Sequence, residues 1–232
     1  MPTCAFDFTG RVREIHNRHV KIEKQLSEHL DDQSGQRHVL ALARYLDTDE
    51  EIMLKIRYDL NPEQFDIEDL KESREDADMM FLHEADGVEN VYAIHHGPRY
   101  ITYVTQPAGQ EMPYPDGWAD FLITSRVPGD DVAEISGELT FDQLESIRKQ
   151  LANILEDISL FPWLFITSED QGTLRYDVQN DKLYFVDFTH MSLIDPNYGN
   201  WTSITPDTTF VTGFNLWSHS HLRRAKEIAK IK

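Results

Sequence analysis

The sequence lacks features that identify several common classes of protein. Cys4 is the only cysteine, so an intramolecular disulfide and a cysteine-based zinc site are both excluded. No apolar run approaches the roughly 20 residues that a membrane-spanning helix needs, and residues 1–10 have neither the basic nor the apolar region of a signal peptide. We therefore expect a cytoplasmic protein with no membrane partner.

Basic residues are also scarce. The chain has 22 Lys and Arg residues against 41 Asp and Glu residues, which gives a formal net charge of −19. The excess is concentrated between Asp47 and Glu89, where sixteen acidic residues accompany four basic ones. Such a surface repels the phosphate backbone of nucleic acids, so DNA or RNA is not expected as a partner. The acidic residues either form a solvated face or attract a cationic substrate or partner.

The motifs of several enzyme classes are missing as well. The sequence has no Gly-x-Ser-x-Gly motif of a serine hydrolase, and Cys4, so near a terminus, is a poor candidate nucleophile. His95 and His96 are adjacent, and adjacent side chains on a strand point in opposite directions, so they could not share one metal ion. A histidine metal site is therefore not expected.

The composition is that of a globular protein, with 40% hydrophobic and 11% aromatic residues. From Arg11 to Asp31, apolar residues recur every three or four positions, which predicts an amphipathic helix. Alternating residues then predict strands, one of which places Lys55 and Arg57 on the same face. The expected strands are 38–46, 51–58, 100–105 and 120–127, with a helix over 73–91 between the second and the third.

Helices are predicted to dominate the second half. Thr140 is expected to cap a long helix from Phe141 to Ile158, whose apolar residues form one continuous stripe. A hairpin over 174–177 and 182–188 follows, and a final helix covers roughly the last eighteen residues. Strands before the midpoint and helices after it indicate an α+β fold of two lobes, about 1–127 with a sheet and about 128–232 mainly helical.

Four short segments resemble the protein-kinase-like superfamily, especially small fungal proteins related to aminoglycoside and choline kinases. The resemblance covers roughly residues 39–194 and depends on the order and spacing of the segments. The segments are Ile52–Tyr58, similar to the third strand of the family; Phe81–Ala85, similar to the helix that follows; Leu122–Gly129, similar to the strand and hinge between lobes; and Tyr184–Phe188, similar to the strand that ends in a metal-binding aspartate.

The resemblance implies a role for several side chains. Lys55 would be the phosphate-binding lysine and Glu84 its partner, with Glu75 and Asp78 as alternatives. Asp187 would hold Mg²⁺ and act in catalysis, with ATP as the other cofactor. The hinge, where the backbone would meet the adenine ring, contains Arg126, which we assign to the cofactor site. Each residue also has a structural interpretation, because Lys55 could be a surface lysine and Asp187 could cap a turn.

Two departures from the family pattern concern the catalytic loops. The family has a glycine-rich loop over the phosphates, whereas here only Gly35 stands near that place. It also has His-x-Asp followed five residues later by Asn, whereas here Asp170 is the nearest candidate base and Arg175 stands where Asn is expected. Phosphoryl transfer needs metal held on two sides. The sequence shows one of them, Asp187, and lacks the asparagine expected on the other.

Three functions are consistent with this pattern. The chain could be a pseudokinase that binds a nucleotide or a partner, or a weak phosphotransferase that acts on a small molecule. Alternatively, the kinase-like scaffold could serve another group transfer in fungal small-molecule or peptide biosynthesis, such as aminoacyl transfer that forms an arginine-containing cyclic dipeptide. An acidic pocket would suit a guanidinium group, but no motif supports that reaction directly.

Overall fold

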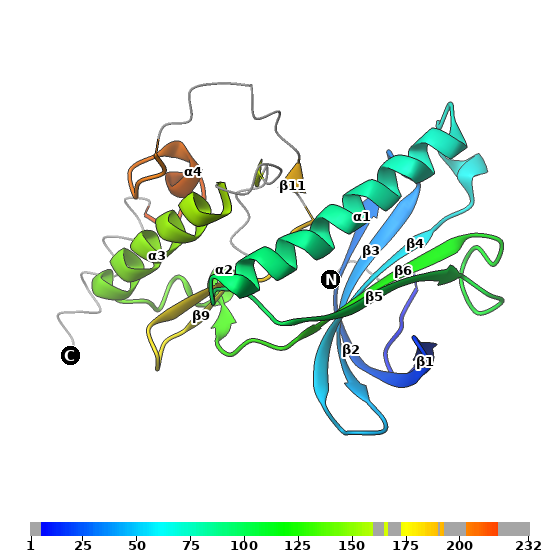
Figure 1. The fold of residues 1–232 in the computed structure, drawn as a ribbon, viewed down its shortest axis with the longest axis horizontal. Helices are drawn as coiled ribbons and strands as arrows, with labels where there is room; N and C mark the ends of the chain where they lie inside the picture. Colours follow the sequence, from blue (N-terminus) through cyan, green and yellow to red (C-terminus); the bar gives the residue numbers. More distant parts are fainter. Residues whose placement is uncertain (1–5, 160–164, 167–172, 190, 193–202, 218–232) are drawn as a thin grey trace. The chain divides into compact units, whose positions relative to one another are not determined.

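The computed structural model describes residues 6–159, 165–166, 173–189, 191–192 and 203–217. The chain divides into two compact units, each built from two segments: residues 1–85 with 99–126, and residues 86–98 with 127–232. Figure 1 shows the sheet of the first unit and the helices and short strands of the second. No helix within the described ranges is long and apolar enough to cross a membrane.

The first unit is built on a six-stranded antiparallel sheet, in which the strands pair in the order β1-β2-β3-β4-β6-β5. A short 3-10 helix (Pro62–Gln64) and helix α1 (Leu70–Ala93) connect β4 to β5. The strands are β1 (Val12–Ile15), β2 (Arg18–Asp31), β3 (Gln36–Tyr45), β4 (Glu51–Asp59), β5 (Tyr100–Pro107) and β6 (Trp118–Ser125). The four strands expected from sequence are all present.

Residues 11–31 form the β1–β2 hairpin, and the prediction of a helix there is wrong. His16 and Asn17 connect the strands with φ of 49° and 61°, the left-handed conformation that two-residue hairpin turns require and that Asn tolerates well. Val20 and Ile22, two positions apart, are fully buried, as expected for a strand. The three-to-four spacing arose because the apolar residues of two different strands were read as one periodic segment.

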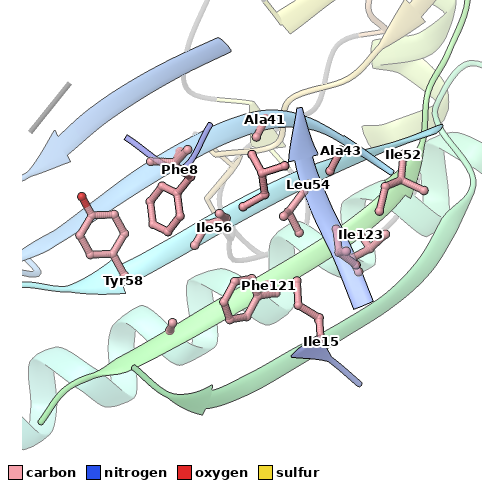
Figure 2. Packing of buried hydrophobic residues seen from close by; sticks show 14 of the residues in the cluster. Phe8, Ile15, Ala41, Ala43, Ile52, Leu54, Ile56, Tyr58, Phe121 and Ile123 are labelled. Atoms are coloured by element: carbon pink, nitrogen blue, oxygen red, sulfur yellow. The ribbon is translucent and has the colours of Figure 1, made fainter. Parts of the chain in front are cut away.

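One face of the sheet carries the hydrophobic core of this unit. Alternate residues of β4 are fully buried in that core, together with residues from β1, β2, β3 and β6. Figure 2 shows these side chains gathered on the same side of the strands. The labelled members are Phe8, Ile15, Ala41, Ala43, Ile52, Leu54, Ile56, Tyr58, Phe121 and Ile123.

The opposite face of β4 is polar, although it too is buried. Lys55 and Arg57 are 8% and 2% exposed, and β6 places Leu122 opposite Lys55 and Asp120 opposite Arg57. Side chains directly opposite on antiparallel strands share a face. The sheet therefore presents a layer of charged side chains on the side away from its hydrophobic core.

Helix α1 covers this polar layer. Asp69 caps its first turn, where the carboxylate accepts hydrogen bonds from the backbone N–H groups of Lys71 (2.9 Å) and Glu72 (3.0 Å). The buried residues then recur at helical spacing and form the stripe that faces the sheet. In the first unit these are Ala77, Phe81, Glu84 and Ala85. The helix predicted over 73–91 is confirmed and is longer at both ends.

The second unit contains the long helix α3 (Phe141–Ser159), which is also confirmed. Six of the seven residues of the predicted stripe are buried, and the seventh, Phe141 at the start of the helix, is partly buried. Thr140 and Gln143 make a reciprocal capping box, in which each side chain accepts a hydrogen bond from the other's backbone N–H. The predicted hairpin is present as β9 (Leu174–Asp177) and β10 (Lys182–Phe185), which are antiparallel.

The other elements of the second unit are short. Strand β7 adds to the hairpin, so the order of that sheet is β10-β9-β7, and β8 pairs with β11. These elements are β7 (Asp130–Asp131), α2 (Val132–Ile135), β8 (Phe165–Ile166), β11 (Met191–Ser192) and α4 (Thr209–Thr212). The helix expected over the last eighteen residues lies almost entirely outside the described residues.

Candidate functional site

Lys55 and Glu84 meet between β4 and α1. The ammonium group of Lys55 donates to Oε1 of Glu84, and the two side chains are only 10% and 2% exposed. The sequence placed these residues 29 positions apart on a strand and a helix, and the structure brings them into contact. The alternatives for Glu84 lie elsewhere, since Glu75 pairs with Lys71 and Asp78 pairs with Arg74.

Arg57 joins this pair, which the sequence did not predict. Its terminal nitrogen Nη2 donates to Oε2 of Glu84 at 2.6 Å, and its side chain is 3% exposed. The guanidinium carbon also lies 5.5 Å from the centre of the Phe81 ring, within range of a cation–π contact. The carboxylate of Glu84 therefore binds one cation on each oxygen.

The turn between β2 and β3 occupies the place where the family pattern has its glycine-rich loop. Asp31 closes this turn on itself. Its carboxylate accepts hydrogen bonds from the backbone N–H groups of Gln33 (3.1 Å) and Ser34 (3.4 Å), and from the hydroxyl of Ser34 (2.7 Å). Two of the backbone donors in this turn, those of Gln33 and Ser34, are thus already bound to a carboxylate.

Gly35 serves the packing of the same turn. Its φ is +63°, a conformation that favours glycine. A Cβ at this position would lie 3.0 Å from Ile67 and 3.3 Å from Phe65. The lack of a side chain at Gly35 is therefore explained by contact with the loop that precedes α1, without reference to a ligand.

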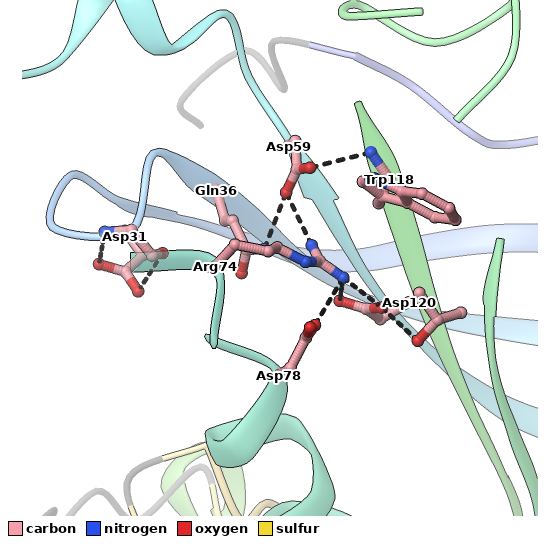
Figure 3. A network of polar contacts seen from close by, with 9 residues as sticks. Asp31, Gln36, Asp59, Arg74, Asp78, Trp118 and Asp120 are labelled. Atoms are coloured by element: carbon pink, nitrogen blue, oxygen red, sulfur yellow. Dashed lines mark hydrogen bonds and ion pairs between the residues drawn. The ribbon is translucent and has the colours of Figure 1, made fainter. Parts of the chain in front are cut away.

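A second buried ion-pair network holds the beginning of α1 (Figure 3). Arg74 donates to Asp59 at 2.9 Å and to both oxygens of Asp120 at 3.0 and 3.2 Å, and it contacts Asp78 at 2.7 Å. Asp120 is fully buried and also accepts a hydrogen bond of 2.7 Å from Thr105. Burial raises the pKa of the Asp120 carboxyl above its usual range, and the contacts with Arg74 and Thr105 offset that rise only in part.

A cavity of about 190 Å³ adjoins this network. It lies between the β2–β3 turn, the end of β4, the first turn of α1 and the β5–β6 loop. Its wall includes Gly35, Asp59, Arg74, Asp116 and Trp118. Two of its three charged wall residues, Asp59 and Arg74, bind each other.

The remaining predicted site residues are Arg126, Asp187 and Asp170. Arg126 is half exposed and pairs with Glu51 at 3.1 Å, at the start of β4. Asp187 belongs to the second unit, where its Oδ1 accepts hydrogen bonds from the backbone N–H (2.9 Å) and hydroxyl (2.5 Å) of Thr189. Asp170 lies outside the described residues. The metal and catalytic roles of Asp170 and Asp187 stay predictions.

The fit of ATP and Mg²⁺ to these residues is incomplete. Lys55 has the charge and the oriented partner that a phosphate-binding lysine needs. The β2–β3 turn fits a phosphate less well, since Asp31 occupies two of its backbone donors. Within the described ranges, no three His, Cys, Asp or Glu side chains are grouped so that they could hold a metal ion.

Comparison with known proteins supports the fold. No protein-family model matches the chain, and no curated protein matches it. Among solved structures, the BubR1 kinase domain superposes with a TM-score of 0.51 at 10% sequence identity, over 84% of this chain and 53% of that one. The Cydia pomonella granulovirus kinase PK-1 gives a TM-score of 0.48 at 15% identity, over 75% of this chain and 53% of that one.

The first of these likenesses indicates a protein-kinase-like α+β fold and, at such low identity, nothing about activity. The chain spans about half the length of each of these kinase structures. The kinase-like fold expected from four short segments is therefore supported, while relatives among fungal phosphotransferases stay a prediction.

Proposed function

We propose that this chain is a pseudokinase, which binds an anionic ligand such as a nucleotide phosphate at Lys55 and does not transfer its phosphoryl group. The fold and the Lys55–Glu84 pair support ligand binding. The observation that carries the second half of the proposal is the Asp31 carboxylate in the β2–β3 turn.

The chemistry of that turn explains why transfer would be lost. Kinase-type catalysis consists mainly of positioning the transferred group and stabilising its charge. Backbone N–H groups in a turn bind phosphate well because they point together at one anion. Here Asp31 is that anion, and it adds a negative charge where a triphosphate would bring several more. A phosphate at Lys55 would thus be held on one side only.

The proposal predicts weak nucleotide binding that does not depend on metal. ATP at about five times its dissociation constant should stabilise the 232-residue chain by about 1 kcal/mol, with Mg²⁺ and with EDTA alike. A thermal-shift titration measures this. Lys55→Met should abolish the shift, whereas Lys24→Met, which removes an exposed lysine of β2, should leave it unchanged.

Replacing Asp31 tests the turn directly. Asp31→Ala frees the N–H groups of Gln33 and Ser34 and should raise the affinity for ATP. Asp32→Ala removes the same charge from an exposed neighbour, so it controls for the loss of electrostatic repulsion alone. Equal effects of the two substitutions, or tight binding that requires Mg²⁺ in the unmodified chain, would contradict the proposal.

A further inference from the structure

Glu84 has two cationic partners, and their side chains differ in chemistry and in exposure. Arg57 and Lys55 are two positions apart on β4, so both side chains face α1. Arg57 is held between Glu84 at 2.6 Å and the ring of Phe81 at 5.5 Å, and its side chain is 3% exposed. Lys55 has a flexible four-carbon side chain with a compact charge, and 10% of it is exposed.

The number of partners matters because a buried carboxylate with no partner strongly destabilises a fold. If Lys55 were the sole cation on Glu84, moving its ammonium group to a ligand would leave that carboxylate uncompensated. With Arg57 on Oε2, Glu84 keeps a charge partner when Lys55 turns away. The guanidinium suits this role, since its planar set of donors is oriented for hydrogen bonds to a carboxylate.

Helix α1 has a further attachment that does not involve Lys55. Arg74 binds Asp59 and Asp120 of the sheet, ten residues before Glu84, which corresponds to about 15 Å along a helix. Arg57 and Arg74 therefore fix α1 to the sheet at two separate points. Neither contact would be broken by an anion that binds Lys55.

We infer that Arg57 is the positioning residue that keeps Glu84 and helix α1 on the sheet, so that Lys55 can exchange Glu84 for an anion without moving the helix. The helix is then a fixed support of the ligand site, and its position does not report whether the site is filled. The part that concerns the anion rests on the proposed function. The part that concerns the helix holds with or without a ligand.

Hydrogen exchange of the α1 amides between residues 74 and 85 tests the helix part in the absence of ligand. Lys55→Met should change their exchange rates by less than about twofold, whereas Arg57→Met should raise them by about tenfold or more. Lys24→Met serves as the control for a lost surface charge. If Lys55→Met raises exchange as much as Arg57→Met does, the inference is wrong.

The effect of ATP on α1 exchange gives a second test. If Arg57 only stabilised the fold, ATP would not change the α1 exchange rate in Arg57→Met. In the unmodified chain, ATP should not speed up α1 exchange. In Arg57→Met, Lys55 alone holds Glu84, so ATP should compete for Lys55 and raise α1 exchange. Faster α1 exchange with ATP in the unmodified chain, or an unchanged rate on binding to Arg57→Met, would overturn the inference.

Two outcomes of this experiment need separate interpretation. If ATP shifts neither the melting temperature nor the exchange of any variant, the proposed ligand is wrong, and the comparison without ligand still decides the role of Arg57. If Arg57→Met does not fold while Lys55→Met does, the result confirms that Arg57 contributes more than Lys55 to holding α1 on the sheet. Arg57→Gln, which keeps a polar donor without the charge, then replaces it in the ATP arm with the same expected results.

Discussion

Arg74 provides a quantitative test of the polar layer between α1 and the sheet. Arg74→Met keeps much of the side chain's apolar volume and removes the guanidinium that contacts Asp59, Asp78 and Asp120. Asp120 is fully buried, so its carboxylate would lose a cationic partner without gaining water. Breaking a buried pair in this way costs about 3–5 kcal/mol. We expect about 3 kcal/mol at neutral pH, since 21% of the Arg74 side chain is exposed.

The pH dependence separates this mechanism from a simple loss of packing. Burial raises the pKa of Asp120, so ionisation of this group opposes folding, and stability is lost as the pH rises from its unfolded pKa through its folded pKa. Without Arg74 the folded pKa rises further. The destabilisation by Arg74→Met should thus be largest at neutral pH and should shrink towards pH 5 as Asp120 binds a proton.

Urea denaturation at the two pH values measures the effect. Asp120→Asn in the Arg74→Met background should restore part of the stability at neutral pH, because the uncompensated charge is gone. Arg126→Met is the matched control, since Arg126 is half exposed and makes a surface ion pair with Glu51, worth at most about 1 kcal/mol. An equal loss at both pH values together with no recovery by Asp120→Asn would refute the electrostatic explanation.

Two further predictions concern the second unit. Leu151→Ala in α3 should lower the free energy of unfolding by about 2–5 kcal/mol because it leaves a cavity in a buried stripe, and a loss as small as that of exposed Lys149→Ala would mean that the stripe faces solvent. Gly129→Ala should cost about 2 kcal/mol or more, since φ is +92° and a Cβ would lie 2.5–2.6 Å from the backbone of Tyr176. Gly109→Ala, which has φ +78° and open space around it, should cost clearly less in the same urea denaturation, and equal losses would contradict the steric explanation.

The sequence predicted elements well where one periodicity ran through a whole segment. The stripe of α3 and the alternation of β4 are of this kind, and both elements have nearly the expected bounds. The first hairpin failed because β1 and β2 are each too short or too irregular to show alternation clearly, and β2 has two register shifts against β3. The pair His16-Asn17 was the local signal of a turn.

Only part of the candidate site was predicted, because periodicity within one element does not show which residues of another element it contacts. Lys55 and Glu84 could be placed by resemblance, and the structure brings them together. Arg57 was on the same strand face as Lys55, but strand alternation does not say which helical carboxylate will lie opposite. Arg74 and Asp120 are 46 residues apart, and only the paired register of β4 and β6 beneath α1 shows that they meet. Such contacts between elements distant in sequence have no periodic signal.

The central claim is that the chain keeps the lysine–glutamate pair of a kinase-like fold and has lost phosphoryl transfer. Phosphate release from ATP in the presence of Mg²⁺ tests it most directly, with the unmodified 232-residue chain and Lys55→Met purified in parallel. The account predicts that both release phosphate at the rate of the buffer alone. Release by the unmodified chain that Lys55→Met abolishes, and that Lys24→Met does not affect, would contradict it and identify the chain as an active enzyme.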